Sequence, residues 1–375
     1  MEYPNDYENE FENEYEPIKP RRRISWPRVI LLVLCVVLAL TLIALVLVTI
    51  VGGRWLNMIN RETQGGTLSS EEIENLYSDA SIDPNFTGAT LDPTDVSWGT
   101  NATEPIFDGE EYINILLVGQ DRRWNETVSR SDAMVLLTFN KRTGVIYMTS
   151  FLRDTYVQIP GYQDNRINVA YALGGMSLLE ETMELNFGVP IDGTLSVDFF
   201  RFPEIIDMLG GLDLTLTQDE ADYLNRRGNW GLGPDVCDWT LTAGVNHMTG
   251  EQCLAFSRLR DIGTDTERVR RQHDVLMGLL DTVKNLPLRD LLGLMDQFLP
   301  MVTTNMTNKQ LLSHAYSLFP MLSDSDIYTQ RIPKFGDYEP VRINNMAVLL
   351  PNLEAIREQL LETLAHNIYA TEPIS

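Results

Sequence analysis

The chain has 375 residues and carries 53 acidic against 29 basic side chains, which gives a formal net charge of −24 at pH 7. Binding to nucleic acid depends on a basic surface that neutralises phosphates, so this balance argues against a DNA or RNA partner. The three cysteines are too few for a metal site.

The chain opens with a polar tail, residues 1–28. A long apolar run follows it, at residues 29–51. Acidic side chains alternate with Asn and Tyr in the first seventeen residues, a composition that predicts disorder. As a helix the apolar run would be about 35 Å long, enough to cross a bilayer core of roughly 30 Å. Because it is also longer than the apolar part of a cleaved secretory signal, we predict a transmembrane anchor.

Basic residues set the orientation of this anchor. Those that stand just before it are Lys19, Arg21, Arg22, Arg23 and Arg28. Arg54 alone follows immediately after it. The positive-inside rule therefore predicts a single-pass protein of the cell membrane, with a cytosolic N-terminus and an extracytoplasmic folded part.

Two regions follow the anchor. Residues 52–110 are rich in Gly, Ser, Thr, Asn, Pro and acidic residues, a composition that predicts an extracytoplasmic stem. Residues 111–370 form the predicted domain, in which apolar strands and helices alternate. This alternation is typical of an α/β fold with a central, largely buried sheet flanked by helices.

Three buried strands are predicted at 112–119, 133–140 and 144–151, because each is a short apolar run bounded by turn residues. Helices are predicted at 176–188, at 199–211 and from Asp265 onward. The C-terminal stretch 346–365 has a helical periodicity, so we expect it to pack as further helix on the same core.

Five charged clusters lie at the ends of these elements: residues 119–123, residues 130–132, Arg153 with Asp154, Arg166 with Asn168, and residues 257–272. Arginine dominates them, and its planar guanidinium can bind two phosphate oxygens at once. The alternative is that these arginines only pair with neighbouring acids such as Asp261, Asp265 and Glu267.

The last cluster contains two capping signals. Thr249 with Gln252 predicts a short helix, after which an extended chain would carry Arg258 and Arg260 on one face. Thr264 with Glu267 predicts the start of a long helix. Arg268, Arg271 and Gln272 lie within its first two turns, where a helix N-terminus favours an anion.

Two aspartates suit a different role. Asp121 and Asp132 flank strand ends, and a pair of carboxylates beside bound phosphate is the usual protein contribution to a Mg²⁺ site. Taken singly, either could instead be an ordinary turn residue.

In order along the chain, these motifs resemble the LytR-CpsA-Psr family of cell-wall glycopolymer ligases. The matching blocks are NILLVGQDRR, SRSDAMVLLTFN, SFLRDTYVQIPG, RINVAYALGG, VDFFRFPEIIDMLGG and GEQCLAFSRLRDIGTDTERVRRQHDVL, all within residues 112–285. The resemblance implies an extracytoplasmic α/β domain with a central mixed sheet. It also implies a phosphotransferase that moves a glycopolymer, such as teichoic acid or capsule polysaccharide, from a polyprenyl-pyrophosphate carrier to peptidoglycan, with the lipid tail in an apolar cavity.

The same resemblance implies roles for individual residues. Asp121 and Asp132 would hold Mg²⁺. The pyrophosphate would be bound by Arg123, Arg130, Arg153, Arg258, Arg260, Arg268 and Gln272. Arg153, Arg258 and Arg260 would also act in catalysis, and Asp198 is a hypothetical general base for the acceptor hydroxyl.

Three questions stay open at this point. A polyprenyl-pyrophosphate pyrophosphatase would share the phosphate site, and a membrane-tethered regulator of the cell envelope would need no turnover. Cys237 and Cys253 both follow the anchor, so a disulfide between them is compatible with the predicted topology. None of the four histidines stands beside a nucleophile motif, so covalent catalysis has no support.

Overall fold

The computed structural model describes residues 52–62, 68–77, 88–98, 106, 111–121, 130–198, 201–227, 239–259, 262, 265–318 and 326–365. The chain separates into two units, Met1–Arg54 and Trp55–Ser375, and the elements below belong to the second. The predicted tail 1–28 and the predicted span 29–51 lie outside the described residues. Within the described ranges, no helix combines the length and the apolar content that crossing a membrane requires.

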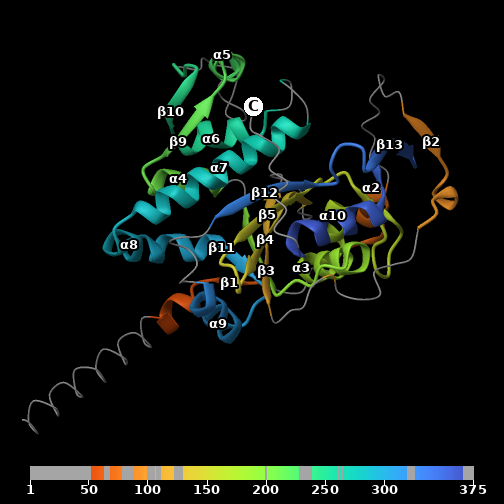
Figure 1. The fold of residues 1–375 in the computed structure, drawn as a ribbon, viewed down its shortest axis with the longest axis horizontal. Helices are drawn as coiled ribbons and strands as arrows, with labels where there is room; N and C mark the ends of the chain where they lie inside the picture. Colours follow the sequence, from red (N-terminus) through yellow and green to blue (C-terminus); the bar gives the residue numbers. More distant parts are fainter. Residues whose placement is uncertain are drawn as a thin grey trace, which may run out of the picture. The chain divides into compact units, whose positions relative to one another are not determined.

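A mixed sheet lies at the centre of the second unit (Figure 1). Among the described residues it has seven strands in the order β1-β11-β8-β3-β4-β5-β12. Their bounds are β1 Asn60–Arg61, β3 Tyr112–Asp121, β4 Arg130–Asn140, β5 Ile146–Phe151, β8 Gly193–Asp198, β11 Val302–Thr304 and β12 Ile327–Ile332. β3 runs parallel to β8 and antiparallel to β4, and β5 runs parallel to β12. The predicted α/β fold with a central mixed sheet is confirmed, and β3, β4 and β5 are the three predicted strands.

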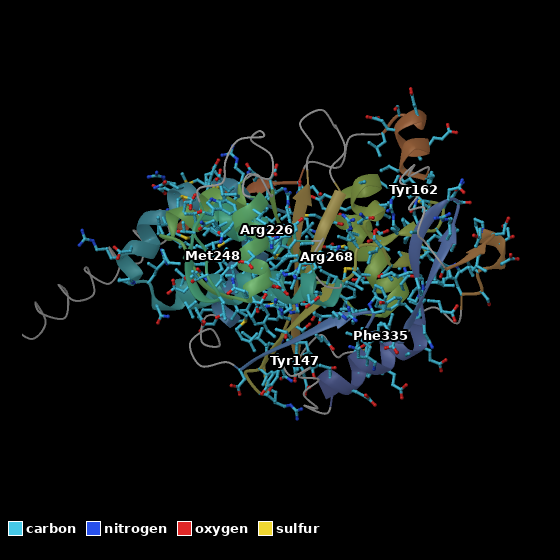
Figure 2. All side chains as sticks on the ribbon, turned by 90° about the horizontal axis from the view of Figure 1, so that it is seen from above. Tyr147, Tyr162, Arg226, Met248, Arg268 and Phe335 are labelled. Carbon is cyan, nitrogen blue, oxygen red and sulfur yellow. The ribbon has the colours of Figure 1, made fainter. Side chains whose placement is uncertain are left out.

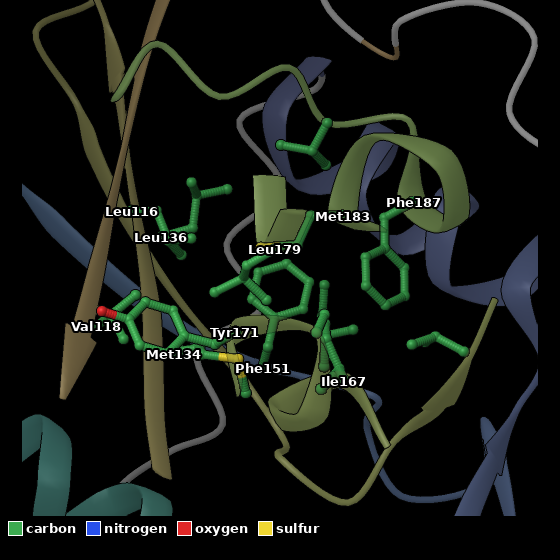
Figure 3. Close-up of a cluster of buried hydrophobic side chains, with 14 of the residues drawn as sticks. Leu116, Val118, Met134, Leu136, Phe151, Ile167, Tyr171, Leu179, Met183 and Phe187 are labelled. Atoms are coloured by element: carbon green, nitrogen blue, oxygen red, sulfur yellow. The ribbon is translucent and has the colours of Figure 1, made fainter. Parts of the chain in front are cut away.

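Helices cover both faces of the sheet. Their bounds are α2 Ser70–Tyr77, α3 Ile167–Phe187, α4 Phe202–Met208, α5 Gln218–Arg227, α6 Gly250–Ser257, α7 Asp265–Asn285, α8 Leu288–Phe298, α9 Asn308–Leu318 and α10 Leu353–Ala365. Leu116 of β3 packs with Leu179 of α3 in one core cluster (Figure 3). The next residue back, Ile115, belongs to a cluster on the opposite face that Leu311 of α9 covers. Burial on both faces explains the almost continuous apolar sequence of β3.

A smaller group of elements has a core of its own. The strands β9 (Leu212–Leu216) and β10 (Gly244–Met248) form an antiparallel pair. They pack with α4, α5, α6 and α7 around buried residues that include Phe256 and Val275. The capping box that Thr249 and Gln252 predicted at the start of α6 is present.

The long helix α3 is broken at Gly174 and Gly175. Gly175 has φ +68°, a conformation that favours glycine, and a Cβ atom there would lie 2.5 Å from Oε1 of Glu62 and displace that carboxylate. The Glu62 carboxylate accepts the Met176 N–H at 2.9 and 3.1 Å, which caps the second half of the helix. Burial, followed by the charge of Glu180, raises the pKa of Glu62.

The described parts of residues 52–110 differ from the separate stem that their composition predicted. β1 pairs in parallel with β11 and extends the main sheet. β2 (Ala89–Leu91) pairs in parallel with β13 (Tyr338–Ile343). Both pairings join residues far apart in the sequence, and backbone hydrogen bonds of this kind leave little trace in composition.

The C-terminal prediction is half wrong. Residues Met346–Pro351 form β14, which pairs with β13 in an antiparallel hairpin, and only α10 after them is helical. Asn344 and Asn345 both have positive φ, 50° and 63°, which is the conformation of a two-residue hairpin turn. The Asn-Asn pair was therefore the sequence signal for this hairpin.

The contact between α6 and α4 gives a test of this packing. A Cβ atom on Gly250 would lie 2.1 Å from the carbonyl oxygen of Pro203, a backbone atom that cannot rotate away. We expect Gly250→Ala to destabilise the domain by about 1–3 kcal/mol, measured by thermal unfolding. Gly293→Ala, on α8 with nothing within 4 Å, is the matched control and should be neutral or stabilising. Equal effects of the two substitutions would contradict the packing.

Candidate active site

Strand register brings four chain segments with predicted site residues together where β3, β5 and β8 end and β4 begins. These strand ends form one edge of the main sheet. Asp121 at the end of β3 is paired with Arg130 at the start of β4. Gln120 is paired with Asp198 at the end of β8. Phe151 at the end of β5 is paired with Met134, two residues beyond Asp132 along β4, and Arg153 follows two residues later. The backbone therefore places Asp121, Arg130, Asp132, Arg153 and Asp198 at the same edge.

A β-bulge lies at this edge. The register between β3 and β4 shifts between Gly119 and Gln120, so Asp132 is the extra residue between Ser131 and Ala133. Bulges of this kind re-aim side chains and are common beside active sites. The side chains of Asp121, Arg130 and Asp132 lie outside the described residues, as do Arg123 and Arg260 altogether.

Asp154 holds two of the cationic side chains. Its carboxylate lies 3.4 Å from Nε of Arg153 and 3.6 Å from Nη1 of Arg166. Arg166 is 8% exposed and Arg153 is half-buried. Asp154 thus positions two guanidinium groups, whose planar forks suit the oxygens of a bound phosphate.

The N-terminus of α3 points to the same place. The Ile167 N–H donates to the carbonyl oxygen of Thr155 at 2.8 Å, and the Asn168 N–H donates to that of Arg153 at 3.4 Å. These bonds tie the first turn of α3 to the loop after β5. The positive end of the helix dipole therefore adds to the charge of the arginines.

Further polar side chains stand in the segments at this edge. Asn168 was named in a charged cluster, whereas Gln120 and Ser131 were given no role. Gln120 donates from Nε2 to Oγ of Ser196 at 2.6 Å and to the hydroxyl of Tyr171 at 2.5 Å. The Ser131 hydroxyl and the Asn168 Oδ1 are buried and have no hydrogen-bond partner within the described part of the chain. Gln120 and Ser131 stand inside the quoted sequence blocks, but a neutral side chain in a strand gives no signal of its own.

Helix α7 is attached to the sheet through one buried histidine. Nε2 of His273 lies 2.6 Å from Oγ of Ser150 on β5. Gln272 is the preceding residue, and Arg268 is one turn earlier on the helix. In the view of Figure 2, Arg268 is seen over the strands of the main sheet, and Met248 of β10 lies to one side. The contact thus holds two predicted phosphate-binding side chains near the strand that leads to Arg153.

Two other arginines of α7 have a structural role, in line with the alternative reading. Arg270 and Arg271 both bind Glu220, an acid far away in the sequence, and Arg270 also binds Asp274 one turn later on the same helix. Burial alone would raise the pKa of Glu220, but its hydrogen bonds and the two positive charges outweigh burial and lower it.

Arg271 also fixes the loop before α7. Its guanidinium donates to the carbonyl oxygens of Leu259 and Ile262 at 3.1 and 2.8 Å, and this loop carries Arg260. Arg258 caps the end of α6 with helical dihedral angles, φ −98° and ψ −1°, so the predicted extended conformation is wrong at this residue.

Cys253 is a buried free thiol on α6. Burial, followed by the charge of Asp207, raises its pKa to about 12. Cys237 lies outside the described residues. The structure therefore gives Cys253 the role of a small core residue.

The His273 contact predicts a pH effect on stability. Burial lowers the pKa of His273 to about 4. As the pH falls below 6.5, the histidine therefore binds a proton in the unfolded chain but stays neutral in the folded chain until the pH approaches 4. The stabilisation from the neutral histidine is then fully present above pH 6.5. It is lost as the pH falls from 6.5 toward 4, and the free energy of unfolding decreases by on the order of 3 kcal/mol.

We expect His273→Asn to reduce the loss of Tm between neutral pH and about pH 5, relative to the unchanged chain. His247→Asn is the control. The hydrogen bond of His247 with Asp213 raises its pKa, so its contribution to stability changes with pH in the opposite direction. A pH profile of Tm that His273→Asn leaves unaltered would contradict the buried neutral state.

Comparison with known proteins agrees with this architecture. A family model, the LytR_cpsA_psr family, matches residues 84–362. The chain is 29% identical over 264 residues to the polyisoprenyl-teichoic acid--peptidoglycan teichoic acid transferase TagT of Bacillus subtilis strain 168, covering 69% of this chain and 79% of that protein.

Two solved structures are similar. TagT bound to LIIa-WTA is 28% identical, with a TM-score of 0.54 over 71% of this chain and 96% of that one. The LytR-CPS2A-psr family protein YwtF (TagT) with bound octaprenyl pyrophosphate lipid is 26% identical, with a TM-score of 0.50 over the same shares. With the family model covering most of the domain, this chain belongs to the LytR-CpsA-Psr family.

Proposed function

We propose that this chain is a membrane-anchored phosphotransferase that moves a glycopolymer from a polyprenyl-pyrophosphate carrier to peptidoglycan. The observation that carries the proposal is the joint position of Arg153, Arg166 and the N-terminus of α3 at the edge of the sheet where Asp121 and Asp132 stand. Cations and the positive end of a helix dipole at one place suit a diphosphate. The name of the TagT relative, a teichoic acid transferase, supports the same reaction.

The reaction assigns a task to each group. An acceptor hydroxyl oxygen attacks the phosphorus next to the glycan, the bond from that phosphorus to the bridging oxygen breaks, and polyprenyl phosphate leaves. Arg153, with the arginines near α6 and α7, stabilises the charge on the phosphate oxygens. Asp198, which stands at the same edge, would take the proton of the hydroxyl. The apolar cavity for the lipid tail remains a prediction.

The anchor belongs to this proposal. Residues 29–51 would span the membrane with the N-terminus in the cytosol, so that the domain meets a lipid-linked donor and peptidoglycan on the outside. The donor is itself held in the membrane by its polyprenyl chain. An anchor on the enzyme would therefore confine both reactants to one surface.

The first test is a transfer assay with the full chain, a synthetic polyprenyl-pyrophosphoryl glycan and uncrosslinked glycan strands. Arg153→Ala should lower the transfer rate by about 100-fold or more, because it removes a charge-stabilising donor. Arg142→Ala is the control, since Arg142 lies in the β4–β5 turn at the opposite end of these strands, and it should retain the rate.

The products separate the alternatives. Polyprenyl phosphate without a glycan conjugate would indicate a pyrophosphatase. An Arg153→Ala chain with undiminished biological activity would indicate a regulator without turnover, and would contradict the proposal.

Magnesium is the cofactor that the site suits. The register places Asp121 and Asp132 on one hairpin end, and carboxylates together with phosphate oxygens form the usual ligand set of Mg²⁺. The buried Ser131 hydroxyl at this edge adds a polar atom without a partner among the described residues. When bound, the ion would neutralise charge on the diphosphate.

We expect chelation to abolish transfer and added Mg²⁺ to restore it in the unchanged chain. Asp132→Asn should raise the Mg²⁺ concentration needed for half of the maximal rate. Asp326→Asn, at the start of β12 and away from this hairpin end, serves as the control. Full activity of the chelated enzyme would rule out the metal.

A further inference from the structure

Helix α9 exposes an apolar stripe. Leu312 is 55% exposed and Tyr316 is 86% exposed, and their spacing of four residues puts them on one face of the helix. Leu311 and Leu318, on the other side, pack against the core cluster that covers the main sheet. On the neighbouring helix α8, Leu292 is 42% exposed. The helix is thus attached to the domain on one side and presents large apolar side chains on the other.

The chain that follows the predicted anchor is bound to these two helices (Figure 1). Nε1 of Trp55 donates to Asp296 of α8 at 2.8 Å, and Asp296 lies one turn beyond Leu292. Arg61 donates to the carbonyl oxygen of Met306 at 2.7 Å and also binds Asn308, the first residue of α9. The described chain therefore reaches α8 and α9 as soon as it begins.

This attachment limits the distance to the membrane. The predicted span ends at residue 51, and four residues of chain reach at most about 14 Å, even when fully extended. The backbone of Trp55 must then lie within that distance of the end of the span, and its side chain binds Asp296. The predicted anchor would consequently hold the parts of α8 and α9 that bind Trp55 and Arg61 close to the bilayer.

Charge favours the same partner. The chain has 53 acidic residues, yet residues 297–323, which include the whole of α9, contain none. Helix α9 also contributes Lys309 one turn before Leu312, whereas the acids of α8 are Asp290 and Asp296, the second of which binds Trp55. Acidic side chains would be repelled by anionic lipid headgroups, whereas Lys and Tyr are typical of membrane interfaces. An amphipathic helix with these residues suits a position in the plane of the interface.

We propose that the exposed face of α9, with Leu292 of α8, docks on the surface of a bilayer that contains anionic lipid. The inference rests on the anchor of the proposed function. Docking fixes the domain at the surface by a second contact in addition to the span. The occupant is the lipid surface, and a second copy of the chain is an outcome that the test must exclude.

The test uses the full chain in vesicles with an anionic lipid fraction. Tyr316→Cys is spin-labelled in a background with Cys35→Ser and Cys237→Ser, while the thiol of Cys253 is buried. The control is Phe335→Cys, because Phe335 is 83% exposed on the turn between β12 and β13. Figure 1 shows β13 far from α9. Collision rates with oxygen, which enters lipid, and with a water-soluble nickel chelate are measured for both labels.

We expect the ratio of oxygen to nickel accessibility to be several-fold higher at position 316 than at position 335. A label at 316 that is as accessible to nickel as the control, in chain that floats with the vesicles, overturns docking and leaves the anchor and the transfer reaction standing. A label shielded from both reagents indicates protein contact and also overturns it. If the chain does not float with the vesicles, both the anchor and docking are overturned. The transfer reaction is still tested by the assay with a soluble donor.

Discussion

The backbone hydrogen bonds that join β3 to β4 and to β8 are the constraint on which the candidate site depends. Through them, residues as far apart in the sequence as Asp121 and Asp198 reach one edge of the sheet. Repulsion among the arginines at that edge opposes this arrangement. It is countered by Asp154, which lies between Arg153 and Arg166, and by the buried contacts that hold the surrounding helices.

The structure separates the arginines of the chain by role. Arg271 is 1% exposed and bonds Glu220 together with two carbonyl oxygens, so its charge is used within the fold. Arg153, at the sheet edge, is half-buried and its Nε lies 3.4 Å from the carboxylate of Asp154. A buried ion pair of the first kind contributes mainly to the shape of the loop that it fixes, because desolvation offsets much of its attraction. The second kind keeps charge in reach of a ligand.

The sequence predicted the elements whose signal is local. β3, β4 and β5 are apolar runs between turns, and the Thr249 capping box marks the start of α6, so all four could be placed from residue patterns. The order of the family blocks also indicated which ends of these strands carry charge. Their meeting at one edge follows from the register, which local patterns do not contain.

Long-range pairing accounts for what the sequence missed. β1 is two residues long and is defined by its partner β11, more than two hundred residues later. The Glu220 partner of Arg271 is likewise remote, and no spacing rule connects them. The hairpin at Asn344 and Asn345 is different, since its turn signal was present but the helical periodicity of the following residues outweighed it.

The Glu62 cap on the broken helix α3 has a practical consequence for work with shortened chains. A shortened chain that begins after residue 62 would lack β1, an edge strand of the main sheet. It would also lack the Glu62 carboxylate that accepts the Met176 N–H group. A recombinant domain that begins at a boundary chosen from composition alone would thus carry a loosened helix next to the arginines. Beginning the expressed chain ahead of Trp55 keeps both the strand and the cap.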